Sequence, residues 1–206
     1  MERTKPNDIT LLQKLMSLNK PSFGLADLEK ILGQRRPSLY VTLNRLVKYG
    51  VLLRLRRGVY LAAFQPSALP RIANTLVYPS YLSFESALSR YGIVSQVPYA
   101  LTFATSRRSQ HLTLGDTVVE FHHLKRELFF GYTLAEGLYL AEPEKALLDQ
   151  CYLAARGLLH LAWDELDTSS LNPTRVQAYA SRFPRAVQAR VRQAFAQALG
   201  VDLAQS

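Results

Sequence analysis

Several residue types and patterns are scarce in this chain, and each scarcity removes a class of protein. A single cysteine, Cys151, rules out an internal disulfide framework and fits a reducing compartment. No uninterrupted apolar run reaches the length that crosses a membrane, and the polar start MERTKPND lacks the apolar core of a signal peptide. We therefore expect a cytoplasmic protein that does not associate with membranes.

Acidic residues are absent between Glu29 and Glu85, where basic residues are concentrated. Residues 1–62 contain 12 Lys and Arg against 4 Asp and Glu, a net charge of +8. Residues 63–206 contain 13 against 12, a net charge of +1. A one-sided positive field attracts polyanions such as nucleic acids. The alternative is a generally basic protein that its charge keeps soluble.

The basic stretch Arg35–Tyr60 has the residue order of a helix followed by a hairpin. Pro37 is a favoured first helical residue, and apolar residues recur after it at helical spacing. The apolar side of this helix consists of Leu39, Leu43, Leu46 and Val47. Gly50 suits the end of the helix, and two short apolar runs then flank a turn at residues 56–58.

Two further amphipathic helices are predicted before this stretch. The first has Asp8 as its cap and apolar positions at Ile9, Leu12, Leu15 and Met16. The second runs from about Leu25 to Leu32. Three short helices followed by a basic hairpin predict a winged helix-turn-helix DNA-binding domain over residues 1–64.

The outward face of the third helix and the hairpin carry the expected DNA contacts. At about 100° per residue, the side opposite the leucines presents cations and hydrogen-bonding groups, as reading the major groove requires. Cations at the hairpin tip suit the phosphate backbone or the minor groove. The alternative is an ordinary amphipathic helix with a solvated charged face. The predicted contact residues are Arg35, Arg36, Ser38, Tyr40, Val41, Thr42, Asn44, Arg45, Lys48, Arg54, Arg56 and Arg57.

The rest of the chain, residues 71–206, is expected to form an α+β domain with a small sheet and a helical tail, after a linker at 65–70. Hydrophobic residues make up 48% of the sequence, which is enough for a true core. Strands are predicted at 100–105, 117–124, 128–133 and 138–141. Helices are predicted at about 70–77 and 84–91, over 143–156, and after Asn172 and Phe183.

Residues that would indicate catalysis or metal binding form no recognisable pattern. None of the ten glycines has Ser two residues later, and no phosphate loop or zinc spacing is present. His122 and His123 are adjacent in a predicted strand, so they point to opposite faces and are poor joint ligands. The serines between 80 and 89, with Lys145 as a base, would suit an enzyme, but turn and cap roles account for most of them. We expect no catalytic residue, no cofactor and no metal.

Four segments together resemble a known family. They are LNRLVKYGVLLRLRRGVY, YPSYLSFESALSRYGIVS, a strand region ending in FFGY, and LAEPEKALLDQCYLAAR. Over roughly residues 8–156 the chain resembles the AbiEi-type antitoxins of bacterial type IV toxin–antitoxin systems. The most specific similarity lies at Tyr78–Gly92 and Ala141–Asp149, and the tail after about Leu158 carries no matching motif.

This resemblance implies a two-domain protein. In that family the N-terminal winged helix represses the system's own promoter, and the C-terminal domain supports antitoxicity and repression. The toxin is a nucleotidyltransferase encoded beside the antitoxin, and the type IV class implies neutralisation without a stable complex. The residues that match the family-like motifs are Tyr81, Ser83, Glu85, Ser86, Glu144, Lys145 and Asp149.

The sequence thus predicts a DNA-binding autorepressor that acts as an antitoxin, with double-stranded operator DNA as its partner. Three alternatives stand beside it. The first is a stand-alone winged-helix regulator, and the second is a protein-interaction module whose winged helix binds an acidic partner. The third is an enzyme that acts on nucleic acid. Winged helices occur in all of these classes, so the fold alone does not choose among them.

Overall fold

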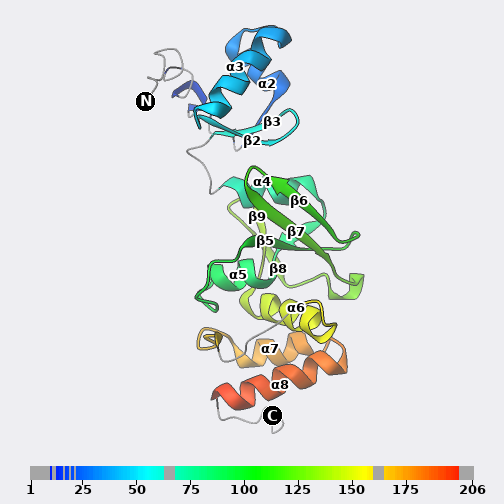
Figure 1. Cartoon of the computed structure of the whole chain (residues 1–206). Coiled ribbons are helices and arrows are strands. Elements are labelled where there is room, and N and C mark those ends of the chain that lie inside the picture. Colours follow the sequence, from blue (N-terminus) through cyan, green and yellow to red (C-terminus); the bar gives the residue numbers. More distant parts are fainter. Residues whose placement is uncertain are drawn as a thin grey trace. The chain divides into compact units, whose positions relative to one another are not determined.

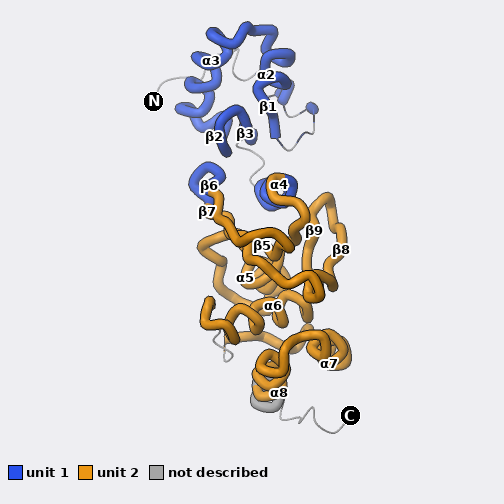
Figure 2. The backbone as a smooth tube through the Cα atoms, turned by 90° about the vertical axis from the view of Figure 1, so that its right-hand side faces the viewer, with its two compact units in different colours: residues 1–75, 113–117 blue, residues 76–112, 118–206 orange. Residues whose placement is uncertain are grey.

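The structure is a computed structural model of a mixed α+β protein (Figure 1). It describes residues 10, 13–15, 17, 18, 20, 22–62, 68–159 and 165–199, with side chains up to residue 193. The chain divides into two compact units, residues 1–75 with 113–117 and residues 76–112 with 118–206 (Figure 2). Among the described helices, none is both long and apolar enough to cross a membrane.

The predicted linker at 65–70 falls only partly within the described residues. Positions 65–67 lie outside them. Leu69 and Pro70 already belong to helix α4 (Leu69–Leu76), so these two positions are helical, and the predicted helix begins one residue earlier than expected.

Within residues 22–62 of the first unit lie the helices α2 (Leu25–Leu32) and α3 (Arg36–Lys48). They accompany a three-stranded antiparallel sheet of order β1–β3–β2. Its strands are β1 (Phe23–Gly24), β2 (Leu52–Arg56) and β3 (Val59–Ala62). Of the predicted first helix, Thr10, residues 13–15 and Ser17 are helical, whereas Asp8, Ile9, Leu12 and Met16 lie outside the described residues.

Local sequence accounts for the helix ends in this unit. The side chain of Asp27 accepts a hydrogen bond from the backbone N–H of Gly24 at 2.9 Å, which satisfies an amide at the start of α2. Gly33 ends α2 in the left-handed region at φ 62°, a conformation that glycine adopts without steric cost. Pro37 lies in the first turn of α3, where its missing N–H removes no helical hydrogen bond.

An apolar core packs the helices and strands within residues 15–62 of the first unit. The inward face predicted for the third helix is confirmed, because Leu39, Leu43 and Leu46 are each 0% exposed. Burying one such side chain contributes about 1.5–3 kcal/mol, so this face fixes which side of α3 remains in water. The other buried members of the core are Leu15, Phe23, Leu28, Leu52, Tyr60 and Ala62.

A six-stranded mixed sheet occupies residues 80–141. Its order is β6–β7–β5–β4–β9–β8, and its central strand β4 pairs antiparallel with β5 and parallel with β9. Strands β5 and β7 are parallel, and β8 and β9 are antiparallel. The strands are β4 (Ser80–Leu82), β5 (Ala100–Thr105), β6 (Gln110–Leu114), β7 (Thr117–His123), β8 (Tyr132–Ala135) and β9 (Leu138–Ala141).

The sheet corrects two parts of the sequence prediction. The strand predicted at 128–133 is wrong at its start, because Arg126–Leu128 forms a 3₁₀ helix and β8 begins only at Tyr132. Strands β4 and β6 were not predicted at all. Strand β4 has three residues, too few for a visible alternation, and in β6 most side chains are exposed, so no apolar pattern marks it.

Helix α6 (Pro143–Ala155) is the centre of the second unit. Figure 1 shows it between α5 (Phe84–Arg90) on one side and α7 (Pro173–Ala180) and α8 (Arg185–Leu199) on the other. The sequence pattern marks one inner face of this helix, at Ala146, Leu147, Cys151 and Leu153 or Ala154, but every residue from Glu144 to Ala154 is buried. The prediction was too narrow because polar members of this helix are buried with partners, and a hydropathy pattern does not register such pairs.

Candidate functional site

The outward face of α3 is open to solvent, as the sequence predicted. Val41 is 71% exposed and Tyr40 is 43% exposed, although both are apolar or aromatic. Thr42 and Arg45 are half-buried. The remaining predicted contact residues of this helix and its cap are exposed, and they are Arg35, Arg36, Ser38, Asn44 and Lys48.

The hairpin of β2 and β3 exposes three arginines, Arg54, Arg56 and Arg57. The register of β2 against β3 shifts between Arg54 and Arg56, which places Leu55 in a β-bulge. Leu55 is 3% exposed, so the bulge lets one residue enter the core while the arginines on both sides remain in water. The tip is tighter than predicted, since Arg56 is still in the strand and the turn is Arg57–Gly58.

Two acidic side chains of the first unit, Asp27 and Glu29, form ion pairs. Lys20 Nζ lies 2.6 Å from Asp27 Oδ2, and Arg36 Nε lies 3.2 Å from Glu29 Oε1. The hydrogen bond from Lys20 holds the pKa of Asp27 below its usual value. Exposed pairs of this kind contribute little stability, about 0–1 kcal/mol. The Arg36–Glu29 pair matters for ligand binding, because a guanidinium that is already paired with a carboxylate is less free to bind a phosphate than the ammonium of Lys48, which has no ion pair among the described residues.

A buried polar cluster lies in the second unit, at residues that the resemblance singled out. The Lys145 ammonium is paired with the Asp149 carboxylate one turn along α6. Asp149 Oδ2 also accepts hydrogen bonds from Tyr81 Oη at 3.0 Å and from Ser83 Oγ at 2.8 Å. Lys145 Nζ donates to Tyr81 Oη at 2.8 Å. All four residues are 0% exposed, so we name them the Lys145–Asp149 cluster.

Aromatic rings surround the ammonium group of this cluster. Lys145 Nζ lies 5.3 Å from the ring centre of Tyr81, 5.1 Å from that of Phe130 and 5.2 Å from that of Phe183. Ring faces carry negative potential and attract cations. Gly131 completes the contact, because a Cβ there would lie 3.1 Å from Lys145 Cγ and the residue adopts φ 67°. The FFGY segment thus forms part of the wall around Lys145.

The pKa directions in the cluster follow from its burial. Burial lowers the pKa of Lys145 and raises the pKa of Asp149, and their mutual attraction opposes both shifts. Burial, followed by the neighbouring Asp149 carboxylate, raises the pKa of Tyr81 well above its usual value. The carboxylate has three donors and the ammonium is capped by rings, so the cluster is satisfied internally. It is closed to solvent, and this geometry suits holding β4 to α6.

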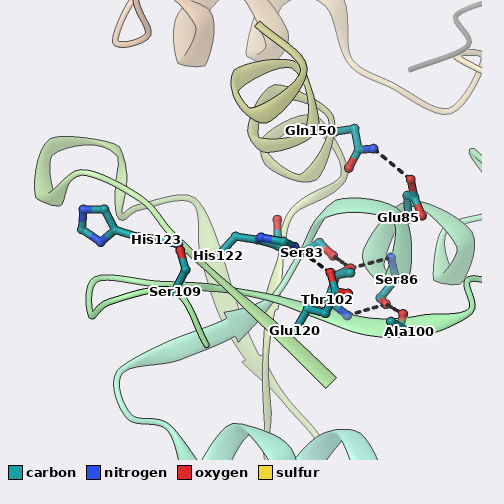
Figure 3. A network of polar contacts seen from close by, with 10 residues as sticks. All are labelled: Ser83, Glu85, Ser86, Ala100, Thr102, Ser109, Glu120, His122, His123 and Gln150. Atoms are coloured by element: carbon teal, nitrogen blue, oxygen red, sulfur yellow. Dashed lines mark hydrogen bonds and ion pairs between the residues drawn. The ribbon is translucent and has the colours of Figure 1, made fainter. Parts of the chain in front are cut away.

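The other residues that matched the family-like motifs lie outside this cluster. Glu85 Oε1 accepts a hydrogen bond from Gln150 Nε2 at 3.2 Å. Ser86 Oγ donates to the carbonyl of Ala100 and accepts from the backbone N–H of Thr102 at 2.8 Å. Figure 3 shows Ser86, Thr102 and Ala100 joined in this way, with the Glu85–Gln150 pair nearby. These contacts tie α5 to β5 and α6.

The carboxylate of Glu144 contacts the start of helix α7. Its Oε1 accepts a hydrogen bond from the backbone N–H of Asn172 at 3.0 Å, and its Oε2 lies 3.7 Å from the Arg175 guanidinium. Asn172 in turn is the N-cap of α7. The ring of Phe183 also lies over the Lys145 ammonium. The segment after Leu158, which carries no recognised motif, therefore contributes to the environment of the Lys145–Asp149 pair.

Sequence reasoning missed several members of these networks. Thr102 accepts from the N–H of Ser86 and donates to the carbonyl of Ser83, and Gln150 and Phe183 were likewise not singled out. Their partners are separated by 16 to 65 positions, so local patterns carry no signal for them. The one signal in the sequence was the run of polar residues at 144, 145, 149 and 150 within a strongly apolar helix.

Within the described part of the chain, no group of three or more His, Cys, Asp or Glu is placed to hold a metal ion. On adjacent positions of β7, His122 is half-buried and His123 is exposed. Comparison with models of known protein families and with curated proteins gives no match.

Proposed function

We propose that residues 1–64, within the first unit, form a winged helix-turn-helix DNA-binding domain, with α3 as its recognition helix and the β2–β3 hairpin as its wing. The observation that carries this proposal is the pairing of a buried leucine face on α3 with an opposite exposed face of cations and polar groups. Three exposed arginines extend that positive surface onto the hairpin. A helix of this kind enters the major groove, and the wing contacts backbone or minor groove.

The biological role that we propose is a cytoplasmic autorepressor and antitoxin of a type IV toxin–antitoxin system. Its support is the sequence resemblance, together with the split between a basic unit and a nearly neutral one. The partner of the system is a nucleotidyltransferase toxin, which the chain neutralises without a stable complex. The second unit, held by the Lys145–Asp149 cluster, supplies the antitoxic part.

A gel-shift titration with the chain's own promoter and with shuffled DNA tests the DNA-binding proposal. Replacing Thr42 by Ala removes a side chain on the groove-facing side of α3, and we expect it to relax preference for the promoter by roughly 1–3 kcal/mol per base contact. Arg192→Ala, on an exposed position of α8, is the control and leaves both affinities unchanged. Equal binding of promoter and shuffled DNA by the unaltered chain would contradict sequence-specific regulation.

A second candidate function is a protein-interaction module that binds an acidic partner. The observation that favours it is the exposure of Val41 and Tyr40 in the middle of the basic face, because exposed apolar and aromatic side chains are typical of protein contacts. This candidate predicts a partner protein that co-purifies with the chain and no salt-dependent DNA binding.

The enzyme interpretation loses support from the positions of its proposed residues. Lys145 is 0% exposed and its ammonium is held by Asp149 and Tyr81. Ser86 is 8% exposed and bonded to backbone groups of β5. The two residues belong to different hydrogen-bond sets, so Lys145 is not placed as a base for Ser86.

A further inference from the structure

A cleft of about 580 Å³ lies in the second unit, away from the Lys145–Asp149 cluster. It is formed by the loop between β5 and β6, the end of β7, and the end of α6 with the turn that follows. Its lining residues are Ser106, Arg107, Arg108, Ser109, His122, His123, Leu153, Arg156 and Leu158. Its size falls within the range of about 300–1,000 Å³ that small-molecule sites occupy.

The charge of this cleft is strongly positive. Arg107, Arg108 and Arg156 line it, and no carboxylate does. Among the described residues, none of these three guanidinium groups forms an ion pair. Two opposing influences are Glu120, which lies 3.2 Å from His122 Nε2, and the C-terminal end of α6. A helix end carries about half an elementary charge, which three guanidinium groups outweigh.

The cleft is also held in shape before any ligand arrives. The backbone N–H of His123 donates to Ser109 Oγ at 2.9 Å, and His123 Nδ1 lies 2.8 Å from the carbonyl oxygen of Arg107. The N–H of Arg107 donates to Thr105 Oγ1 at 3.1 Å. Figure 3 shows Ser109 beside His123, apart from the Ser86 network. These bonds attach the arginine loop to β7, so binding a ligand costs less conformational entropy.

One side of the cleft is apolar. Leu153 is 1% exposed, and Leu158, at 56%, is accessible to a ligand. The guanidinium of Arg156 lies over the Tyr152 ring, 5.5 Å from its centre, which keeps it at the boundary between the apolar and the cationic sides. Guanidinium groups bind phosphate oxygens through two parallel hydrogen bonds, and serine hydroxyls add further donors.

We propose that this cleft binds a phosphorylated small molecule of mononucleotide size, with its phosphates on Arg107, Arg108 and Arg156 and its uncharged part against Leu158. The site is separate from the α3 face and gives the second unit a ligand of its own. The pairing of a cationic end with an apolar wall in a bounded cleft favours a free nucleotide over a polynucleotide backbone, which needs an extended surface.

Calorimetric titration of the full chain with ATP and with inorganic pyrophosphate, without magnesium and at fixed ionic strength, tests the proposal. We expect ATP to bind with a dissociation constant below about 1 mM, and more tightly than pyrophosphate because of the apolar wall. Arg107→Glu with Arg108→Glu weakens ATP binding at least about tenfold, since it removes two guanidinium groups that donate charge-assisted hydrogen bonds. The matched control, Arg90→Glu with Arg192→Glu, changes the net charge equally on exposed positions of the same unit and leaves the affinity within about twofold.

Three results would overturn the proposal. The first is no binding of either probe by the unaltered chain, and the second is an equal loss of affinity in the control variant, which would assign binding to the general field. The third is displacement of ATP by a DNA duplex together with a matching loss of DNA affinity in the cleft variant, which would make the cleft part of a DNA surface. If the glutamate variant does not fold, Arg107→Ala with Arg108→Ala gives the same test.

Discussion

The two units use charged side chains in opposite ways. In the first, Lys48, Arg54 and Arg56 are exposed to water, because the leucines of α3 and Leu55 of β2 face the core. In the second, Lys145 and Asp149 are 0% exposed, and their charged groups bind each other and the hydroxyls of Tyr81 and Ser83. Exposed charge can reach a partner but contributes little to stability, whereas buried charge cannot reach a partner and its removal is costly.

This difference separates residues that are exposed and available to a partner from residues that hold the fold. The sequence motifs singled out both sets equally, because a motif records which residue types recur and not whether they reach solvent. If the proposed DNA-binding function is correct, substitutions of the exposed cations in the first unit change DNA binding with little effect on stability. Substitutions in the Lys145–Asp149 cluster should change stability first.

The largest effect is expected from Asp149→Ala. It leaves the Lys145 ammonium buried without its carboxylate and removes the acceptor used by Tyr81 and Ser83, so the free energy of unfolding should fall by about 3–5 kcal/mol. Urea denaturation followed by circular dichroism measures this. The double variant Lys145→Met with Asp149→Leu is the control, because it removes both charges. Equal decreases in the single and double variants would contradict the account of a buried ion pair.

Ionisation of Tyr81 at alkaline pH is expected to lower the stability of the fold by a smaller amount. Its pKa is raised in the folded state, so the folded chain keeps a proton that the unfolded chain releases above about pH 10. The stability from this group is complete below pH 10 and is lost as pH rises, by at most about 1.4 kcal/mol per pH unit. Tyr81→Phe should flatten the fall in melting temperature above pH 10, whereas Tyr99→Phe, at a 90% exposed position, should not. Identical slopes in both variants would exclude Tyr81 as the cause.

The smallest effect distinguishes two cations of the first unit. Arg36 is paired with Glu29, whereas Lys48 has no ion pair among the described residues. Lys48→Ala should reduce the salt dependence of DNA binding by about 0.9 in the logarithmic slope, and Arg36→Ala by less. Fluorescence anisotropy at several salt concentrations measures both slopes. A larger change for Arg36 would show that DNA breaks its pair with Glu29.

The elements whose apolar residues recur at a regular spacing could be predicted from the sequence. Pro37, the leucine spacing of α3 and Gly50 predicted the helix and its buried side, and the turn predicted at residues 56–58 lies at Arg57–Gly58. Strand β4 and the all-round burial of α6 depend on contacts between distant segments, so no local pattern reveals them. For the same reason, the motif residues were found, but the grouping of Tyr81 and Ser83 with Asp149, and not with Ser86, required the structure.

The most direct test of the central claim is the salt dependence of DNA binding by the full chain, compared with Arg56→Glu together with Arg57→Glu. If the exposed face of α3 and the hairpin bind DNA, the logarithm of the affinity falls linearly with the logarithm of salt concentration. The variant then weakens binding to promoter and random DNA alike and lowers the slope by about 0.9 for each phosphate that it no longer neutralises. DNA binding that does not depend on salt, or a variant whose affinity and slope equal those of the unaltered chain, would contradict the claim.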